Sequence, residues 1–579
     1  MRPRVLAVVL ACLAPVVSGC LGIPDEGPIV ETRTEADPNE ELGYYNDPPP
    51  PESGDQPAEI VTGFLDALTA IPVQTNTAKE FLTPAAASSW RPQRRTITYA
   101  AASLPEGSNR VSLELAGANQ LDGGGSWRGP LPADDRVLTF TMQRDEGEWR
   151  IAELPDARVV PEAWFSQAFR RVSLSFLDPS AQIVVPEPVF LPRGDQLATA
   201  LVDRLIQGPS RSLRGSVEQS FVPPGVDVDL SVTVSDAGVA DIQLTGGVPV
   251  PSERDAALMV AQLTSALSQD SSLTGLRISI NGEPVILSEG EPKFDMDRGR
   301  YYDPTGTESS SQLFALRGGQ LVLGDADGLA QATGPMGEDD LGVAAIGVDL
   351  RGTRVAGVTA GGGRMLVTDV SDPDAGVVTV ARGSTRLLPP AWDFADRMWI
   401  VDRPAGGAEL SVRENGRVRP VRVPGVTGRE VSRMLVSRDG SRLVAVIDRG
   451  ADDRIVVSRV RYDDRDRVVG ATRARAISWE EQPRASVLDI GWASPTSLTV
   501  LHRLSGDLTQ LQTLPVDGAP AGLSDISVTL QGSTRGLVSS PRATDAVLVG
   551  TADGLVDVLG PSEDPILDTA GLVSPTYVG

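Results

Sequence analysis

The sequence offers few side chains for nucleophilic or metal chemistry. Its single histidine is His502, and its two cysteines are Cys12 and Cys20. A serine or cysteine nucleophile is ordinarily activated by a neighbouring base such as histidine, and zinc sites are built mainly from histidine and cysteine. The composition therefore excludes nucleophile–histidine pairs and the common zinc sites almost completely. We predict no catalytic, cofactor-binding or metal-binding residues, and we interpret His502 as an ordinary strand residue.

Carboxylates are abundant, with 77 Asp and Glu residues, so a hydrolase that uses carboxylates stays open. The motif SRDGSRL at 437–443 nevertheless lacks the S-x-D-x-G-x-x-W form of a sialidase Asp-box. GDADG at 324–328 has the oxygen-rich composition of a calcium loop but lacks the remaining EF-hand ligands. Glycine-rich stretches elsewhere lack the spacing of a phosphate loop. We interpret these motifs as turns, and we expect Trp392 and Trp399 in the core rather than on a binding face.

Cys20 follows a segment with the features of an export signal. Two arginines precede an apolar run, Val5–Val17, which is too short to span a bilayer and is followed by small residues. A cysteine directly after such a segment resembles the lipobox of bacterial lipoproteins, although Val17 stands where leucine is more usual. The resemblance implies removal of residues 1–19 as a signal peptide and lipidation of Cys20 by S-diacylglycerol and N-palmitoyl groups. A plain secreted protein with an incidental Cys20 and an uncleaved anchor helix are the alternatives.

Length and charge narrow the class of protein. The 579 residues suffice for about three or four domains, and the formal net charge is −25. Such a charge repels polyanions, so nucleic acid is not expected as a partner. Loss of the signal would leave Cys20 as the only thiol, which excludes an intramolecular disulfide. Because no later apolar run approaches the length of a membrane span, we expect a lipid-anchored protein on the extracytoplasmic face of the cell membrane.

Residues 20–57, which start at the lipidated Cys20, are acidic and rich in proline, which indicates a semi-extended tether. In residues 58–157, apolar residues at helical spacing come first, and segments with apolar residues at every second position follow. This order predicts an α+β N-terminal domain. The shape of such a domain resembles a small NTF2-like cone. The predicted helical face consists of Ile60, Val61, Phe64, Leu65 and Leu68.

Residues 158–290 contain a second α+β pattern, in which two helices flank a β-hairpin and a second hairpin follows. The first hairpin is predicted over 228–244, the second helix begins after the favoured N-cap residue Ser252, and Asn281-Gly282 marks the second hairpin. This order resembles the GerMN domain of spore-germination and actinobacterial envelope proteins. The resemblance implies a GerMN-like α+β domain that serves as a binding module.

From residue 313 to 579, after a polar linker predicted over 291–312, the chain consists almost entirely of short apolar segments separated by polar turns. One unit recurs at a spacing that fits propeller blades of about 40 to 50 residues. We therefore predict an all-β C-terminal propeller of about six blades, closed by pairing of residues 571–579 with strands near 313–323. A pair of large β-sandwiches is the alternative. The recurring units start near residues 346, 391, 434, 488 and 536.

The combination of lipobox, acidic tether, α+β domain, GerMN-like domain and propeller resembles the LpqB family of actinobacterial lipoproteins across essentially the whole chain. The segments 80–92 and 164–179 also look like that family. The resemblance implies an accessory lipoprotein that contacts the extracytoplasmic domain of an MtrB-like sensor histidine kinase and modulates two-component signalling to envelope and division genes. No cofactor is implied. A lipoprotein that binds cell-wall glycan or a small ligand is the first alternative, and a propeller hydrolase is the second.

Overall fold

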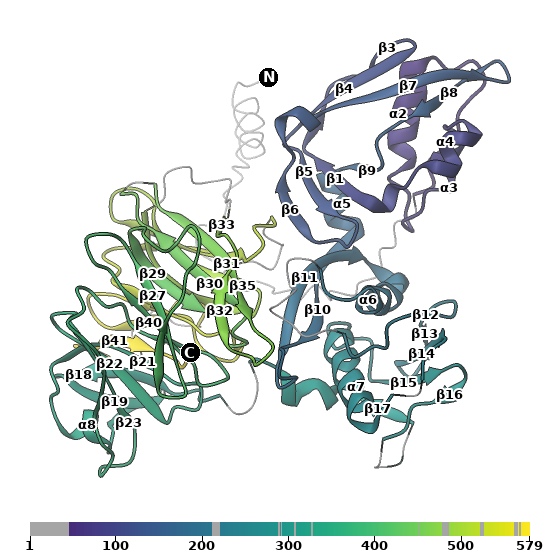
Figure 1. Cartoon of the computed structure of the whole chain (residues 1–579). Coiled ribbons are helices and arrows are strands. Elements are labelled where there is room, and N and C mark those ends of the chain that lie inside the picture. Colours follow the sequence, from purple (N-terminus) through teal and green to yellow (C-terminus); the bar gives the residue numbers. More distant parts are fainter. Residues whose placement is uncertain are drawn as a thin grey trace, which may run out of the picture. The chain divides into compact units, whose positions relative to one another are not determined.

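The computed structural model describes residues 46–579 except for 211–219, 250, 288–289, 291, 306–308, 326–327, 451, 478–485, 521–525, 561–565 and 567–568. Within the described residues, two α+β regions precede a region built from strands (Figure 1). This confirms the predicted multidomain fold class.

The first α+β region begins with helix α2, Pro57–Ala67. Proline is favourable in the first turn, because the N–H that it lacks would have no partner within the helix there. The backbone N–H of Gln56, which precedes the helix, donates to the carboxylate of Glu59 at 2.7 Å, so one of the free donors at the helix start is satisfied. The predicted apolar face is confirmed, because all five of its residues are buried. The exposed fractions are 0% for Ile60, 0% for Val61, 2% for Phe64, 8% for Leu65 and 0% for Leu68.

Two mainly antiparallel sheets share one hydrophobic core with this helix. Their strand orders are β6-β5-β1-β9 and β2-β4-β7-β8. The hairpin from β7 to β8 turns at Glu146-Gly147, where φ is 51° and 94°, as a tight hairpin turn requires. Helix α5 contributes Trp164 and Phe165 to the same core, so the packing of this region continues past residue 157. The other elements are α3 Asn76–Glu80, α4 Pro84–Ser89, β1 Arg95–Tyr99, β2 Ala101–Ala102, β3 Glu106–Gly107, β4 Arg110–Ala116, β5 Asn119–Asp122, β6 Trp127–Pro130, β7 Val137–Asp145, β8 Glu148–Glu153, β9 Arg158–Pro161 and α5 Glu162–Ala168.

The second α+β region starts with a long antiparallel hairpin and continues into a sheet of order β12-β14-β15-β16. Strands β14 and β15 are parallel and are joined through helix α7, whose start is capped by Ser252, which accepts a hydrogen bond from the N–H of Asp255. The turn Asn281-Gly282 joins β15 to β16 as predicted. The elements are β10 Phe169–Leu177, β11 Val184–Pro192, α6 Leu197–Ile206, β12 Val226–Val228, β13 Thr233–Val234, β14 Val239–Gly246, α7 Glu253–Leu267, β15 Gly275–Ile280 and β16 Glu283–Pro284.

Two details of this region differ from the sequence prediction. The first strand of the hairpin over 228–244 is interrupted between β12 and β13, and Leu230 is 92% exposed although its spacing predicted an inward position. The interruption coincides with a hydrogen bond from the N–H of Val232 to the hydroxyl of Thr199 on α6, which takes this backbone out of the ladder with β14.

The segment predicted as a linker also contributes to the second region. Strand β17, Lys293–Asp295, pairs antiparallel with β15, and Phe294 is 2% exposed in the core. The 3₁₀ segment η4, Met296–Tyr302, follows and packs against α7. Phe294 thus joins this polar stretch to the sheet, because burying one large side chain offsets the ordering of a short strand.

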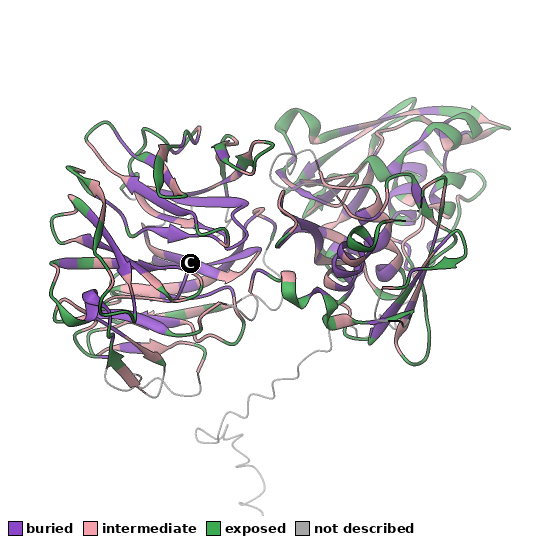
Figure 2. Cartoon of the chain, turned by 60° about the horizontal axis from the view of Figure 1, so that its bottom comes forward, coloured by how far each residue is buried: buried purple, intermediate pink, exposed green. Residues whose placement is uncertain are grey.

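In the described part of the last region, six small antiparallel sheets follow one another, and the first strands of successive sheets are neighbours. This is the predicted propeller, and the recurring units coincide with its blades. Buried strands alternate with exposed loops around it (Figure 2). The strands before the last closing strand are β18 Leu313–Arg317, β19 Gln320–Asp325, β20 Gly328–Gln331, β21 Val343–Val348, β22 Arg354–Thr359, β23 Arg364–Asp369, β24 Val378–Arg382, β25 Ala391–Trp392, β26 Met398–Asp402, β27 Glu409–Glu414, β28 Arg417–Pro420, β29 Val431–Val436, β30 Arg442–Ile447, β31 Arg454–Tyr462, β32 Val468–Ala471, β33 Arg475–Ala476, β34 Ser486–Ser494, β35 Ser497–Arg503, β36 Leu508–Pro515, β37 Ser527–Gln531, β38 Gly536–Val538, β39 Leu548–Gly550 and β40 Leu555–Asp557, and the short helix α8 spans Pro335–Glu338.

The ring is closed by the C-terminal strand β41, Val573–Thr576, which pairs with β18 of the first blade. The predicted closure is therefore confirmed. Beyond the strand, Tyr577 packs with Leu313 of the first blade and with Val538 and Leu548 of the last blade. The first blade thus combines residues from both ends of the propeller region, so the ring cannot be complete until the whole region is present.

Candidate functional site

Cys20, the predicted lipidation site, lies outside the described residues, so its modification stays a prediction. Residues 326 and 327 of the GDADG motif also lie outside them. No helix in the described ranges is long and apolar enough to cross a membrane. The same ranges contain no group of three or more His, Cys, Asp or Glu residues that could hold a metal ion. The candidate sites are therefore cavities and buried polar clusters.

A cavity of about 750 Å³ lies at one end of the central channel of the propeller. We call it the channel mouth. Every blade contributes to its lining, because the innermost strands of the blades converge there. One lining residue from each blade illustrates this arrangement: Thr576, Ile346, Leu388, Met434, Ile490 and Leu537.

Among the residues that the structure describes, the charged side chains that line the channel mouth are three arginines, Arg403, Arg433 and Arg535, and one carboxylate, Asp489. The Nε of Arg433 donates to Oδ1 of Asp489 at 2.8 Å, and Oδ2 of Asp489 accepts the backbone N–H of Leu537 at 3.0 Å. The single carboxylate is therefore already engaged on both oxygens. The lining keeps an excess of positive charge in a chain whose formal net charge is −25.

Arg403 lies between two other cations. Its Nε donates to the carbonyl of Arg386 at 3.1 Å, and its Nη1 donates to the carbonyl of Val431 at 3.4 Å. Partial burial lowers the pKa of Arg403, the neighbouring guanidinium groups of Arg386 and Arg433 lower it further, and Glu430 and Asp402 oppose the shift. The guanidinium groups of Arg386 and Arg433 thus disfavour the charge on Arg403, and an anion bound beside them would favour it.

The charged lining suits binding better than hydrolysis. Glycoside hydrolysis ordinarily uses two carboxyl groups on opposite sides of the scissile bond, whereas the described lining holds Asp489 alone. The hydroxyl of Ser574 accepts the N–H of Ile346, and the hydroxyl of Thr569 accepts the N–H of Leu555 and donates to the carbonyl of Ile566. These two hydroxyls are therefore already hydrogen-bonded to backbone groups. The arginines can hold an oxyanion through charge-assisted hydrogen bonds.

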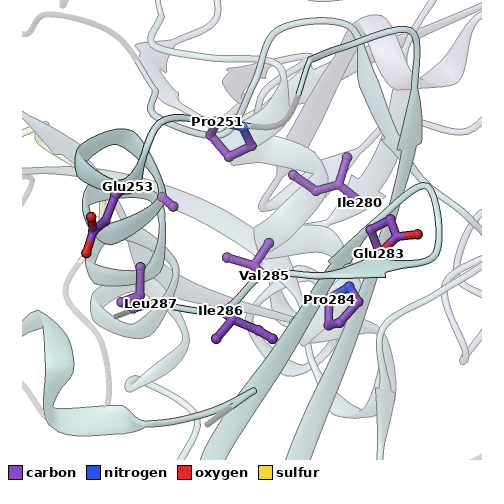
Figure 3. Close-up of a pocket in the computed structure, with 9 residues that line it drawn as sticks. Pro251, Glu253, Ile280, Glu283, Pro284, Val285, Ile286 and Leu287 are labelled. Atoms are coloured by element: carbon purple, nitrogen blue, oxygen red, sulfur yellow. The ribbon is translucent and has the colours of Figure 1, made fainter. Parts of the chain in front are cut away.

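A second, shallower pocket of about 430 Å³ lies in the second α+β region, which we call the GerMN-like region from here on. The pocket is between the start of α7 and the β15–β16 hairpin. Its lining is largely apolar, and Ile286 is 54% exposed. Figure 3 shows the carboxylates of Glu253 and Glu283 at opposite sides, with Ile280 and Val285 between them. This arrangement has no convergent polar groups, so it offers an apolar contact surface rather than a site for chemistry.

Acidic turns recur at the other ends of the innermost strands. Asp349, Asp393 and Asp439 each accept backbone N–H groups of their own turn, and each pairs with an arginine shortly after it. In blade three, Arg397 and Asp393 are buried, and Asp393 also accepts the indole N–H of Trp399 at 3.1 Å. The SRDGSRL motif is thus a structural turn, as its sequence predicted.

One of these turns contacts strand β11 of the second α+β region. Arg442 is completely buried, and its guanidinium donates to the carbonyl of Pro186 on β11. It also lies 3.6 Å from a carboxylate oxygen of Glu187 and 3.5 Å from one of Asp439. Arg459 donates to the same oxygen of Glu187. We call these four charged residues the junction cluster.

Burial lowers the pKa of Arg442 to about 10, and the nearby cation Arg459 contributes to the shift, while Asp439 and Glu187 oppose it. The charged form of Arg442 is therefore held in the folded protein by the two carboxylates against the effect of desolvation. The junction cluster was not predicted. Glu187 lies in the proline-rich stretch VVPEPV, which carries no sequence signal for a buried ion pair.

The remaining sequence predictions for individual residues are confirmed by burial. Trp392 and Trp399 are 0% and 1% exposed, so they belong to the blade core. His502 lies on β35 and is 0% exposed, and burial lowers its pKa. The arginines of the channel mouth were missed, because each belongs to a different blade and none stands in a motif of its own.

Comparison with known proteins identifies three successive domains. The family model for the N-terminal domain of lipoprotein LpqB matches residues 50–166, the model for the sporulation and spore germination domain matches 173–286, and the model for the LpqB β-propeller domain matches 319–563. The chain belongs to the LpqB lipoprotein family. Membership explains the order of the two α+β regions and the propeller, and it confirms the resemblance inferred from the sequence.

Relatives in the LpqB family match nearly the whole chain. Lipoprotein LpqB of Streptomyces avermitilis is 27% identical over 90% of this chain and 90% of its own length. Lipoprotein LpqB of Thermobifida fusca is 25% identical over 97% of this chain and 95% of its own length. Among solved structures, the tandem GerMN domains of the sporulation protein GerM from Bacillus subtilis match 22% of this chain and 45% of that chain, at 22% identity and a TM-score of 0.19.

Proposed function

We propose that this LpqB-family lipoprotein is an accessory protein of a two-component system. In this proposal it is held on the extracytoplasmic face of the cell membrane by the lipid on Cys20, and it modulates an MtrB-like sensor histidine kinase by contact with the extracytoplasmic domain of that kinase. The observation that carries the proposal is the match to LpqB lipoproteins over nearly the entire chain. The downstream effect would fall on cell-envelope and cell-division genes.

Action by contact, rather than by catalysis, accords with the described side chains. The charged groups of the channel mouth comprise one engaged carboxylate and three arginines, and the pocket of the GerMN-like region is largely apolar. Apolar pockets with exposed rims, such as the one bordered by Ile286, are typical of protein-binding surfaces. These features favour a binding protein, and a propeller hydrolase is the least supported of the three hypotheses.

Retention on an immobilised kinase ectodomain tests the proposal against its first alternative. The mature chain, purified with serine at position 20 to keep it soluble without lipid, is passed over the ectodomain and, separately, over insoluble peptidoglycan. We expect retention on the ectodomain that survives moderate salt, since specific protein interfaces rest mainly on buried apolar contact. Retention on peptidoglycan alone would favour a glycan-binding lipoprotein and contradict the kinase proposal.

A small-ligand receptor is the second candidate function, and one observation favours it specifically. The channel mouth has the volume of a typical small-molecule site and brings charged and apolar side chains together. Such a receptor function is compatible with contact to a kinase, because a ligand in the channel mouth occupies only one end of the propeller.

A further inference from the structure

We propose that the channel mouth of the propeller binds a small organic anion, whose carboxylate or phosphate oxygens are held by Arg433, Arg403 and Arg535. This inference deepens the small-ligand receptor function proposed above, on which it rests, by naming the class of ligand, and it holds whether or not the chain contacts a kinase. It rests on the charge of the lining, on the donors left available there and on the size of the cavity.

The available donors point into one cavity from three blades. A guanidinium group has five N–H donors. Arg403 uses its Nε and Nη1 for the two hydrogen bonds to backbone carbonyls described above. Arg433 uses its Nε for Asp489 and its Nη1 for the carbonyl of Ser432, at 2.9 Å. The exposed guanidinium of Arg535 makes no hydrogen bond or ion pair with the described residues. Donors on all three side chains thus remain for an oxyanion.

The described carboxylates nearby offset the charge of these arginines only in part. Asp402 accepts hydrogen bonds from the backbone N–H groups of Thr385, Arg386 and Arg403. Glu430 forms a surface ion pair with Arg386 at 3.6 Å. Asp553, on a neighbouring loop, is exposed and lies outside the described lining. Among the described lining residues, three arginines therefore face one carboxylate, and an anion in the cavity would meet an excess of positive charge.

The negative net charge of the chain does not oppose this site. At physiological ionic strength the Debye length is about 8 Å, so carboxylates on distant surfaces are screened. Charges within the cavity act over shorter distances and through less water, where their effect is stronger. The local excess of arginine therefore determines which ions are attracted into the channel mouth.

Size and apolar lining define the rest of the ligand. A volume of about 750 Å³ lies within the range of about 300 to 1,000 Å³ that small-molecule sites occupy. Leu388, Met434 and Ile490 line the cavity beside the arginines. An organic body of modest size would contact these side chains while its anionic group meets the guanidinium groups. A bare inorganic ion would not contact these apolar side chains.

Calorimetric titration of the full mature chain tests the site with three probes. These are N-acetyl-dialanine with a free C-terminal carboxylate, its C-terminal amide, and glucose 1-phosphate. We expect binding of the carboxylate, the phosphate or both, with affinity falling as salt is raised, and no binding of the amide. The probe that binds identifies the anionic group. Absence of binding by both anions, or equal binding of the amide, would overturn the proposal.

Variants then locate the binding. Arg433→Gln leaves Asp489 without its ion-pair partner, so the decisive variant is Arg535→Gln, whose side chain is exposed and makes no such pair. We expect each to weaken binding of the anion by at least about tenfold, as loss of a charge-assisted hydrogen bond does. The matched control is Arg417→Gln, an exposed arginine on β28 outside the cavity. Unchanged binding by Arg535→Gln, or equal weakening by Arg417→Gln, would refute the assignment.

Discussion

Replacing Glu187 by glutamine is expected to lower the free energy of unfolding of the mature chain by about 3 to 5 kcal/mol, because it breaks a buried ion pair and leaves Arg459 without its carboxylate partner. Arg442 is 0% exposed and Arg459 is largely buried, and both face the carboxylate of Glu187. Glutamine preserves the shape of the side chain and its acceptor oxygen. The loss therefore reports the charge rather than a cavity.

Urea unfolding monitored together with amide hydrogen exchange measures this effect. We expect protection to fall first in β11 and in the turn 437–442, which contain the residues of the contact. A matched control is Glu430→Gln, which removes the same charge from an ion pair whose side chains are each 57% exposed. Surface pairs contribute about 1 kcal/mol or less, so this variant should unfold almost like the unchanged chain.

A double variant separates the charge effect from local packing. Adding Arg459→Met to Glu187→Gln removes the cation that pairs with Glu187 and supplies an apolar side chain of similar length, while Arg442 keeps its ion pair with Asp439. We expect it to recover roughly half of the lost stability, since apolar replacement of buried ion pairs is often neutral or favourable. If Glu187→Gln alone behaves like the surface control, the contact between β11 and the propeller does not contribute to stability.

Truncating Tyr577 to alanine is expected to destabilise the propeller by about 3 to 5 kcal/mol, which corresponds to a thermal transition roughly 10 °C lower. The ring of Tyr577 packs between the first and last blades, and its hydroxyl donates to the carbonyl of Ala546 at 3.2 Å. Deletion of residues 572–579 should have a larger effect, because β18 then loses its strand partner as well.

Scanning calorimetry of the mature chain provides the measurement, and Val573→Ala provides the control within the same strand. Val573 is 51% exposed, so its truncation should change stability by less than about 0.5 kcal/mol. A Tyr577→Ala variant with an unchanged transition would show that closure of the ring by the C-terminus is not what holds the first and last blades together.

The propeller could be predicted because its signals are local and repeated. Each blade shows its own strand periodicity and polar turns, so the pattern survives errors in any one blade. The interruption near Leu230 and the strand at Phe294 could not be predicted, because both depend on contacts with residues distant in sequence, Thr199 on α6 and β15. Local periodicity carries no information about such partners.

The candidate sites were harder to foresee for the same reason. The channel mouth combines single arginines from three blades, and Arg433 and Asp489 are neighbours only because adjacent blades bring their strands together. In the junction cluster, Glu187 and Arg442 are equally remote from each other in the chain. A local pattern, such as the apolar segment before Cys20, allows a prediction from the sequence alone, and the lipidation of Cys20 stays such a prediction.

Phosphorylation of the response regulator in a clean deletion strain tests the central claim most directly. We expect the phosphorylated fraction to change on deletion, to return to its original level with the unchanged gene, and to stay altered with a Cys20→Ser version that is produced but not held at the membrane. The two acyl chains of a diacylglycerol on one cysteine already give strong membrane binding, so loss of the thiol should release the protein. An unaltered phosphorylated fraction in the deletion strain would contradict the account.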